Sequence, residues 1–358
     1  MQTLKKYLFI LTPSERKDAV LLLFMILIMA LLDMIGVASI LPFVAVLTNP
    51  GLIETNFILK EMFQASMMLG VESTKQFLFV LGFLVFFLLV ITLIFKAITT
   101  YVQVRFVQMR QYSVGKRLIE GYLYQPYSWF LNHHSSDLGK NILTEVASVT
   151  GGLSALLELI AKSMVTIALI ILLVINDPKL ALIVGISLGG AYLLIFYFSH
   201  SYLKRLGKIR LKSNTLRFIA VNEAFGAAKE IKVGGLEQTY IKNFSDSAQN
   251  MARTISSASV ISLLPRFFLE AIAFGGILLI ILYMMGQSGN FNAALPVLSL
   301  YIFAGYRLMP ALQQIYVSFT SLTFVKPSLD KLYSDIKNLK PLKEKQYDGI
   351  LTFNKKIV

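Results

Sequence analysis

Several charged side chains lie inside long runs of apolar residues, and they are the groups in this sequence best placed to do chemistry. The cations are Lys96, Lys162, Arg266 and Arg307, and the acids nearest to them in sequence are Glu158 and Glu270. Ionisable groups within apolar segments are candidate functional positions by default. Arginine suits phosphate because its guanidinium donates two parallel hydrogen bonds. The pattern therefore predicts a site for an anionic group such as a diphosphate.

Arg307 is the strongest candidate for lining such a site, since Tyr306 flanks it and no acidic residue lies one turn away. Arg266, Glu270 and Lys162 are further candidates. At about 1.5 Å per residue, the four cations lie roughly 20 to 28 Å from the outer ends of their segments. The alternative is that the cations reach the inner interface and only anchor the helices, and that pairs four residues apart neutralise each other.

Lys96 fits the anchoring role better than the lining role. Asp33, in the first apolar run, either lines the same cavity or bonds to a neighbouring helix, and the second interpretation is favoured.

The composition is that of a polytopic α-helical membrane protein. Of 358 residues, 56% are hydrophobic and 15% are charged, whereas about 25% are charged in an average soluble domain. Zero cysteines exclude disulfides, thiolate metal sites and cysteine catalysis. Six apolar segments are long enough to span a bilayer, and they cover residues 19–47, 77–95, 153–175, 180–198, 260–285 and 291–319.

The net charge of +14 is distributed as in a membrane protein, so no nucleic-acid partner is expected. Lys and Arg gather in two long loops and both flanks. The three other loops contain only three basic residues, namely Lys60, Lys75 and Lys179. The positive-inside rule then places both termini and both long loops in the cytoplasm.

The two long loops predict helical arms that extend beyond the membrane. One arm continues from the second apolar segment, ends at Pro126 and returns through residues 138–152. The other covers residues 200–257, with a turn near Gly226 and Gly234–Gly235. Twenty-odd residues per arm would reach roughly 30 Å from the bilayer. Such arms suit a protein that passes motion to a partner inside the cell.

This organisation resembles the membrane half of ABC exporters, an all-α membrane fold (type IV) of six transmembrane helices with long cytoplasmic extensions. Pro126-Tyr127-Ser128-Trp129-Phe130-Leu131 leading to Asp137 is similar to the family's first coupling helix. Asn222-Glu223-Ala224-Phe225-Gly226 leading to Lys229-Glu230-Ile231-Lys232 is similar to the second. Residues 12–17, 32–36 and 40–43 look most like the lipid-linked oligosaccharide flippases of the family.

The resemblance implies an ATP-driven exporter or flippase for a lipid-type substrate, working as a homodimer in the bacterial inner membrane. The coupling residues that it implies are Trp129, Phe130 and Asp137 in a first turn segment (Trp129–Asp137), and Glu223, Phe225, Gly226 and Ile231 in a second turn segment (Glu223–Lys232). Apolar anchors favour this interpretation over that of two ordinary solvated turns.

The sequence holds no phosphate loop of the form G-x-x-x-x-G-K-[ST]. ATP and Mg²⁺ would therefore be bound by a nucleotide-binding domain, not by these residues, and no catalytic residue is expected among them. We expect residues 1–325 to form the transmembrane domain, 326–348 a linker helix, and 349–358 the first strand of a truncated ATP-binding domain. His133 and His134 predict no metal site, because adjacent side chains point apart on a helix.

Three other functions compete with the flippase. An exporter of peptides or drugs would share the architecture, but the basic inner half argues against it. A secondary carrier would need broken helices at the midplane, and no paired Gly/Pro interruptions occur in corresponding segments. A membrane-embedded enzyme lacks a supporting set of His, Asp and Glu.

Overall fold

The computed structural model describes residues 2–339, except 40, 41, 44, 45, 48, 49, 52, 54, 55, 68–70, 72, 177 and 287–290. Within that part the regular structure is entirely helical. In chain order the helices are α1 (Gln2–Ile10), α2 (Pro13–Ala38), α5 (Phe57–Met67), α6 (Thr74–Leu123), α7 (Tyr127–Phe130), α8 (Ser135–Lys140), the π-helix η1 (Asn141–Glu145), α9 (Val146–Asn176), α10 (Pro178–Gly226), α11 (Ala228–Gly234), α12 (Glu237–Gly286) and α13 (Phe291–Asn338).

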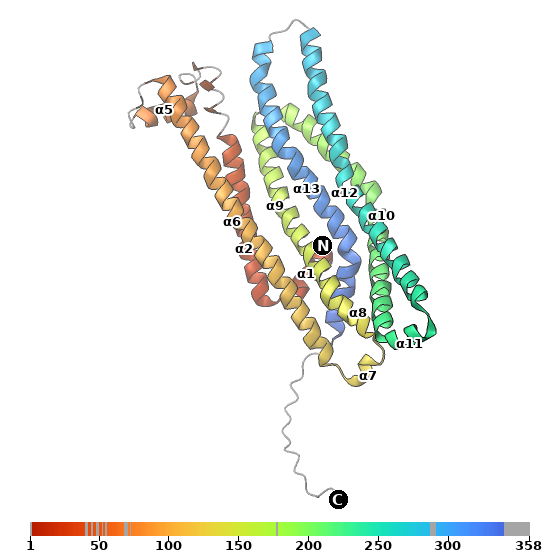
Figure 1. Ribbon diagram of the computed structural model, residues 1–358. Helices are drawn as coiled ribbons and strands as arrows, with labels where there is room; N and C mark the ends of the chain where they lie inside the picture. Colours follow the sequence, from red (N-terminus) through yellow and green to blue (C-terminus); the bar gives the residue numbers. More distant parts are fainter. Residues whose placement is uncertain are drawn as a thin grey trace, which may run out of the picture.

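The long helices form an elongated bundle in which α2 packs on α6, α9 on α13, and α10 on α12 (Figure 1). Contacts of α2 with α9 and of α10 with α13 join these pairs. The short helices lie at opposite ends of the bundle. α5 lies at one end, and α7, α8 and α11 lie at the other, here called the α7/α11 end (Figure 1).

Among the described residues, three helical stretches are long and apolar enough to cross a membrane, namely Pro13–Gly36, Thr74–Leu123 and Ser135–Ile171. They overlap the first, second and third segments expected from hydropathy, and only the second segment, 77–95, lies wholly within its stretch. The other three expected spans fall on α10, α12 and α13, many of whose side chains lie outside the described set, so the count of six stays a prediction.

The helix that begins the first expected apolar segment, α2, is shorter than that segment. α2 ends at Ala38 rather than near residue 47, and Ser39 donates its hydroxyl hydrogen bond back to the Gly36 carbonyl at 2.9 Å.

The start of α2 is built as its sequence indicates. The Thr12 backbone N–H donates to Glu15 Oε2 at 2.8 Å, and the Glu15 N–H donates to Thr12 Oγ1 at 3.3 Å. This reciprocal pair is a capping box. Arg110 of α6 lies 3.1 Å from Glu15 Oε1 and so attaches the same corner to the next helix.

The loop expected over residues 48–75 contains a helix that hydropathy alone did not indicate. In α5 and around it, apolar side chains pack on the start of α6, with Phe63 and Phe77 edge to face at 5.1 Å. Ser73 caps α6 by accepting from the Gln76 N–H, while Gln76 accepts from the Ser73 N–H. The loop is therefore a folded part of the bundle end.

Residues 326–338, which fall within the linker helix expected over 326–348, belong to α13. Leu329 and Leu332 of this stretch are buried in a core with Leu118, Tyr122 and Val146. α10 approaches α13 so closely that a Cβ at Gly207 would lie 2.2 Å from the Phe324 carbonyl oxygen. The end of α13 is thus packed within the bundle. Residues 340–358, including the expected first strand, lie outside the described part.

Candidate functional site

The charged groups within the bundle are largely paired. Asp33 of α2 lies 3.7 Å from Lys96 of α6, with the Asp33 side chain 8% and the Lys96 side chain 38% exposed. This contact agrees with the prediction that Asp33 bonds to a neighbouring helix. Because the two residues are far apart in sequence, spacing alone did not identify Asp33 as the companion of Lys96.

Lys162 of α9 lacks the partner that its spacing suggested. Glu158, one turn earlier, instead accepts a hydrogen bond from Gln314 of α13. Within the part of the chain that the structure describes, Lys162 forms no ion pair. The charged groups that act on it are Lys96, Glu158 and Asp33. Lys162 therefore lies in a half-buried position beside one other cation and two carboxylates, with no ammonium–carboxylate contact of its own.

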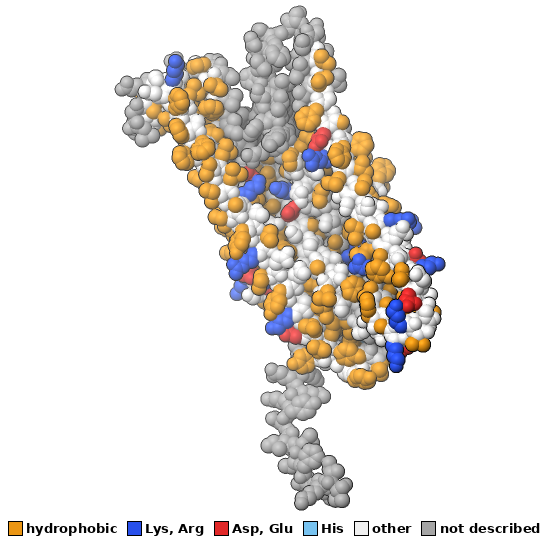
Figure 2. Space-filling model, in the orientation of Figure 1, with side chains coloured by type: hydrophobic (Ala, Val, Ile, Leu, Met, Phe, Trp, Pro, Cys, Tyr) orange, Lys and Arg blue, Asp and Glu red, His pale blue; other side chains and the backbone are white. Residues whose placement is uncertain are grey.

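Arg266 and Glu270 form the pair expected along α12, with Arg266 Nε 2.6 Å from Glu270 Oε1. The Arg266 side chain is 52% exposed in the single chain. On the face that Figure 2 shows, charged side chains are frequent toward the α7/α11 end. The side chains of Arg307 and Tyr306, on α13, lie outside the described part.

The first turn segment is packed against its own bundle. The Trp129 ring stacks on Tyr122 of α6, with centroids 5.5 Å apart, and on His133 at 3.8 Å. Phe130 meets Trp129 edge to face at 5.2 Å. Trp129 and Phe130 are half-buried. Phe130 and its neighbours also border an open groove of about 730 Å³ beside α6.

Asp137, the third residue expected to couple, pairs with a buried lysine. Lys140 is 1% exposed, and its ammonium donates to Asp137 Oδ1 and, at 2.6 Å, to Thr215 Oγ1 of α10. A buried ammonium is stable only with such partners. Asp137 therefore helps to bind the first turn segment to α10.

The second turn segment projects from the bundle between α10 and α12. Phe225 is 79% exposed, and Glu223 and Gly226 are also exposed, whereas Ile231 is 7% exposed. Ile231 thus holds α11 in place, and Phe225 offers an apolar side chain to a partner. Val233, which the sequence did not single out, is exposed in the same way.

The turn after α11 depends on Gly235, the residue at which φ is +62°. This left-handed conformation is costly for residues with a Cβ. Across the turn, Lys232 Nζ lies 3.0 Å from Glu237 Oε1. The hydrogen bond from Lys232 lowers the pKa of the exposed Glu237 carboxyl below its usual value.

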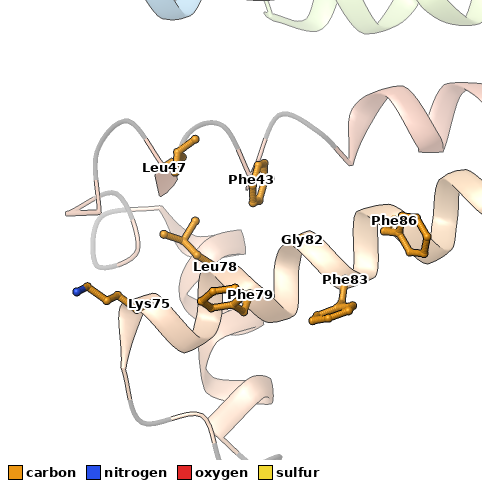
Figure 3. A pocket seen from close by; sticks show the side chains of 8 residues that line it. All are labelled: Phe43, Leu47, Lys75, Leu78, Phe79, Gly82, Phe83 and Phe86. Atoms are coloured by element: carbon orange, nitrogen blue, oxygen red, sulfur yellow. The ribbon is translucent and has the colours of Figure 1, made fainter.

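A second pocket, of about 570 Å³, lies at the α5 end (Figure 3). Its lining is almost entirely apolar, and Lys75 extends from its edge, away from the aromatic rings (Figure 3). Gly82 faces Phe43, since a Cβ at Gly82 would make an ordinary contact with the Phe43 ring at 3.5 Å. The lining residues are Phe43, Leu47, Lys75, Leu78, Phe79, Gly82, Phe83 and Phe86.

Sequence reasoning missed a buried polar network beside the first turn segment. Glu145, at the end of η1, is 1% exposed and receives Arg210 and Asn214 of α10. Asn141, at the start of η1, donates to Asp335 of α13 at 3.0 Å. The sequence signal for this network is weak. Polar residues recur three or four apart at 141, 145 and 148, but nothing in that spacing predicts a π-helix.

No group of three or more His, Asp and Glu that could hold a metal ion occurs among the described residues. His133 is instead part of the aromatic stack, and its Nδ1 lies 2.8 Å from the Trp129 carbonyl oxygen.

Two comparisons bear on this arrangement. The family described as the ABC transporter transmembrane region matches residues 38–307. A solved structure described as a bacterial Atm1-family ABC exporter with ATP bound is similar with a TM-score of 0.62 and 12% sequence identity. The match covers 90% of this chain and 54% of that one, so the chain spans about half the length of the exporter. At that identity the likeness shows the fold alone, and it confirms the all-α exporter fold expected from the sequence.

Proposed function

The chain belongs to the family of ABC transporter transmembrane regions, and on that premise we propose that it is the membrane half of an ATP-driven flippase for an anionic lipid, such as a lipid-linked oligosaccharide. It works as a homodimer in the bacterial inner membrane, with both termini in the cytoplasm. A nucleotide-binding domain, fused or separate, binds ATP and Mg²⁺ and supplies the hydrolysis.

The observation that carries the lipid assignment is the pattern of charge pairing inside the bundle. Arg266 lies 2.6 Å and Lys96 3.7 Å from a carboxylate oxygen, whereas Lys162 forms no direct ion pair among the described residues, although Glu158 and Asp33 lie close enough to act on it. A half-buried ammonium without a carboxylate in direct contact is costly in a membrane protein, and an anion that binds it directly lowers that cost. A phosphate of a lipid headgroup supplies that anion. Arg307, about 24 Å along its span at 1.5 Å per residue, would add a bidentate donor at similar depth.

The apolar pocket at the α5 end supports a lipid over a peptide. Its aromatic lining has no side-chain carboxylate, and its one charged residue is Lys75. A lipid chain fits such a lining, with its phosphate beside the ammonium. Peptide substrates would require several hydrogen-bonding groups in the same space.

At the α7/α11 end, the two turn segments receive the motion of the ATP-binding domain. Phe225 and Val233 supply exposed apolar contacts there. Helix-in-groove docking depends on a few such anchors.

The proposal is tested with the assembled transporter in proteoliposomes. The probe is a fluorescent polyisoprenyl diphosphate, compared with fluorescent phosphatidylcholine, and the readout is ATP-dependent protection of the probe from a membrane-impermeant quencher. The variants are Lys162→Gln and Arg307→Ala, and Lys116→Gln, on an exposed part of α6, is the matched control. We expect each test variant to lower diphosphate translocation at least tenfold while basal ATP hydrolysis changes less than twofold.

Equal translocation by both test variants and the wild type would contradict the role of the cations. Translocation of phosphatidylcholine as fast as the diphosphate would contradict the substrate class. Transport of peptides or drugs without lipid translocation would favour the alternative exporter.

A further inference from the structure

Glu158 of α9 has two possible partners, and it contacts only one of them. Lys162 lies one turn further along the same helix, at the spacing at which an acid and a base commonly pair. Glu158 Oε2 instead accepts a hydrogen bond from Gln314 Nε2 of α13. Within the described part of the chain, Lys162 forms no ion pair. The carboxylate is therefore held by a neutral amide of another helix and not by the nearest ammonium of its own.

Three other acid–base neighbours at the same spacing do meet. Their nitrogen and oxygen atoms lie 2.6, 3.1 and 3.7 Å apart in the pairs Arg266–Glu270, Lys331–Asp335 and Lys116–Glu120. The spacing of Glu158 and Lys162 is thus compatible with an ion pair along α9. What differs at Glu158 is the amide of Gln314, which reaches the carboxylate from the neighbouring helix.

The charged groups that act on Lys162 come from three helices. They are Lys96 of α6, Asp33 of α2 and Glu158 of α9 itself, and α9 packs against both α2 and α6. Asp33 lies 3.7 Å from Lys96. Because one carboxylate lies beside Lys96 and the other bonds to Gln314, the half-buried Lys162 ammonium has no carboxylate in direct contact among the described residues.

The direction in which Glu158 points decides how readily an anion can bind Lys162. Coulomb attraction falls with distance, so a carboxylate in contact with an ammonium neutralises it more fully than one that is turned away. An anion that approaches such a contact must displace the carboxylate or lie beside a like charge, and both cost free energy. A contact between two charged groups is also stronger than one from a neutral amide. Glu158 thus forms the weaker of its two available contacts, and Lys162 stays open to an anion.

We propose that Gln314 is a positioning residue that holds Glu158 away from Lys162 and so keeps the ammonium available to the phosphate of an anionic lipid headgroup. Without the amide, Glu158 turns along α9 to Lys162 and occupies the place of the phosphate. The inference rests on the proposed function in that the headgroup binds at Lys162, whereas the competition between Gln314 and Lys162 for Glu158 requires no substrate.

The key variant is Gln314→Met, because methionine has a similar length and a good helix propensity but no donor. The measurement is the Kd of the assembled transporter in nanodiscs for a fluorescent polyisoprenyl diphosphate. We expect Gln314→Met to raise this Kd about tenfold, since a contact between charged groups must then be broken before the anion binds. Fluorescent polyisoprenol, which lacks the diphosphate, should bind the variant and the wild type equally. Gln313→Met, the same change about 100° round α13, is the matched control and should leave both values unchanged.

A second substitution separates positioning from helix packing. Gln314→Met/Glu158→Gln also lacks the bond between α9 and α13, but it has no carboxylate at 158 that could pair with Lys162. We expect its Kd for the diphosphate to return to within twofold of the wild type. If the double variant binds the diphosphate as weakly as Gln314→Met does, the bond only joins the two helices and the proposal is overturned. If Gln314→Met fails to fold, Gln314→Ala with and without Glu158→Gln gives the same comparison.

A crystal structure of the Gln314→Met transporter without substrate tests the contact itself. We expect the Glu158 carboxylate within ion-pair distance of Lys162 Nζ, and a carboxylate that stays turned away would overturn the proposal. Lys162→Gln distinguishes this failure from that of the proposed function. A Kd raised by Lys162→Gln but not by Gln314→Met would overturn the role of Gln314 and leave the phosphate site intact. A Kd unchanged by Lys162→Gln, beside a Glu158–Lys162 contact in the Gln314→Met structure, would contradict the phosphate site and with it the use of the open ammonium proposed here.

Discussion

Each of the two turn segments of this chain connects two long helices, but the apolar residues of the two segments differ in burial. In the first, Trp129 lies between Tyr122 and His133 and so belongs to the bundle. In the second, Phe225 extends into solvent, as does Val233 directly after the segment, and only Ile231 is buried. Each segment has an aromatic residue near its turn, yet one aromatic holds the segment in place and the other is free to contact a partner.

The difference separates two tasks that similar motifs perform. A segment that transmits force must be fixed to the helices behind it, and a segment that docks must expose its anchors. The first turn segment meets the former requirement through Trp129 and Lys140, and the second meets the latter through Phe225. The comparison therefore predicts opposite effects of matched substitutions in the two segments.

The largest effect is expected from Trp129→Ala. It removes two stacked ring contacts from a half-buried site and should lower the free energy of unfolding by about 3 kcal/mol, the low end for large aromatic truncations. The thermal unfolding midpoint of the purified chain in detergent measures this. Trp129→Phe, which retains a ring beside Tyr122, should recover most of the loss, and Leu131→Ala, at an exposed neighbour, should cost almost nothing. A stable Trp129→Ala chain would mean that the stack does not hold this segment.

Ile231→Ala should have the next largest effect. Ile231 is the buried residue of α11, and truncating a buried isoleucine costs roughly 2 kcal/mol or more. Val233→Ala is the control, since it is a smaller apolar truncation two residues away at an exposed position. Equal unfolding midpoints for the two variants would show that α11 is not attached through Ile231, and the two segments would then differ less than the structure indicates.

Much of this fold could be predicted because long apolar runs and capping residues act locally. The Thr12–Glu15 capping box, the arm ending near Pro126 and the turn at Gly226–Gly235 depend on neighbours in sequence. The same holds for the Arg266–Glu270 pair, whose partners are one turn apart. Where partner and residue lie on one helix and no side chain of another helix competes for either, spacing is sufficient evidence.

The remaining features depend on contacts between distant helices, and sequence spacing carries no record of them. Asp33 meets Lys96, Gln314 takes Glu158 away from Lys162, and Arg210 reaches Glu145. The π turn adds a further difficulty, because it arises from packing around η1 and has no residue signature of its own. For the same reason, the sequence identified Trp129 and Ile231 as anchors but did not predict that their side chains face their own bundle.

Gly235→Ala should have a smaller effect than either core change. At φ +62° a Cβ is strained, and the expected loss is about 1 kcal/mol. Gly234→Ala, at the last residue of α11, is the matched control and should cost less, since its backbone is helical. The unfolding midpoints of the two variants decide the point. A larger loss for Gly234→Ala would place the strain elsewhere in the turn.

The smallest change in stability, and the opposite change in function, is expected from Phe225→Ala. Its side chain is 79% exposed, so the free energy of unfolding should stay within about 0.5 kcal/mol of the wild type, as for most surface substitutions. In the assembled transporter the same change removes an anchor for the ATP-binding domain, and loss of one such anchor costs about 2 kcal/mol or more in docking. We therefore expect transport per ATP hydrolysed to fall about tenfold with an unchanged unfolding midpoint. Lys229→Ala, an exposed change in the same segment that retains Phe225, should leave both quantities unaltered. If Phe225→Ala lowered the unfolding midpoint while transport per ATP stayed constant, the second turn segment would be a structural turn like the first, because its aromatic residue would then serve the bundle and not the partner.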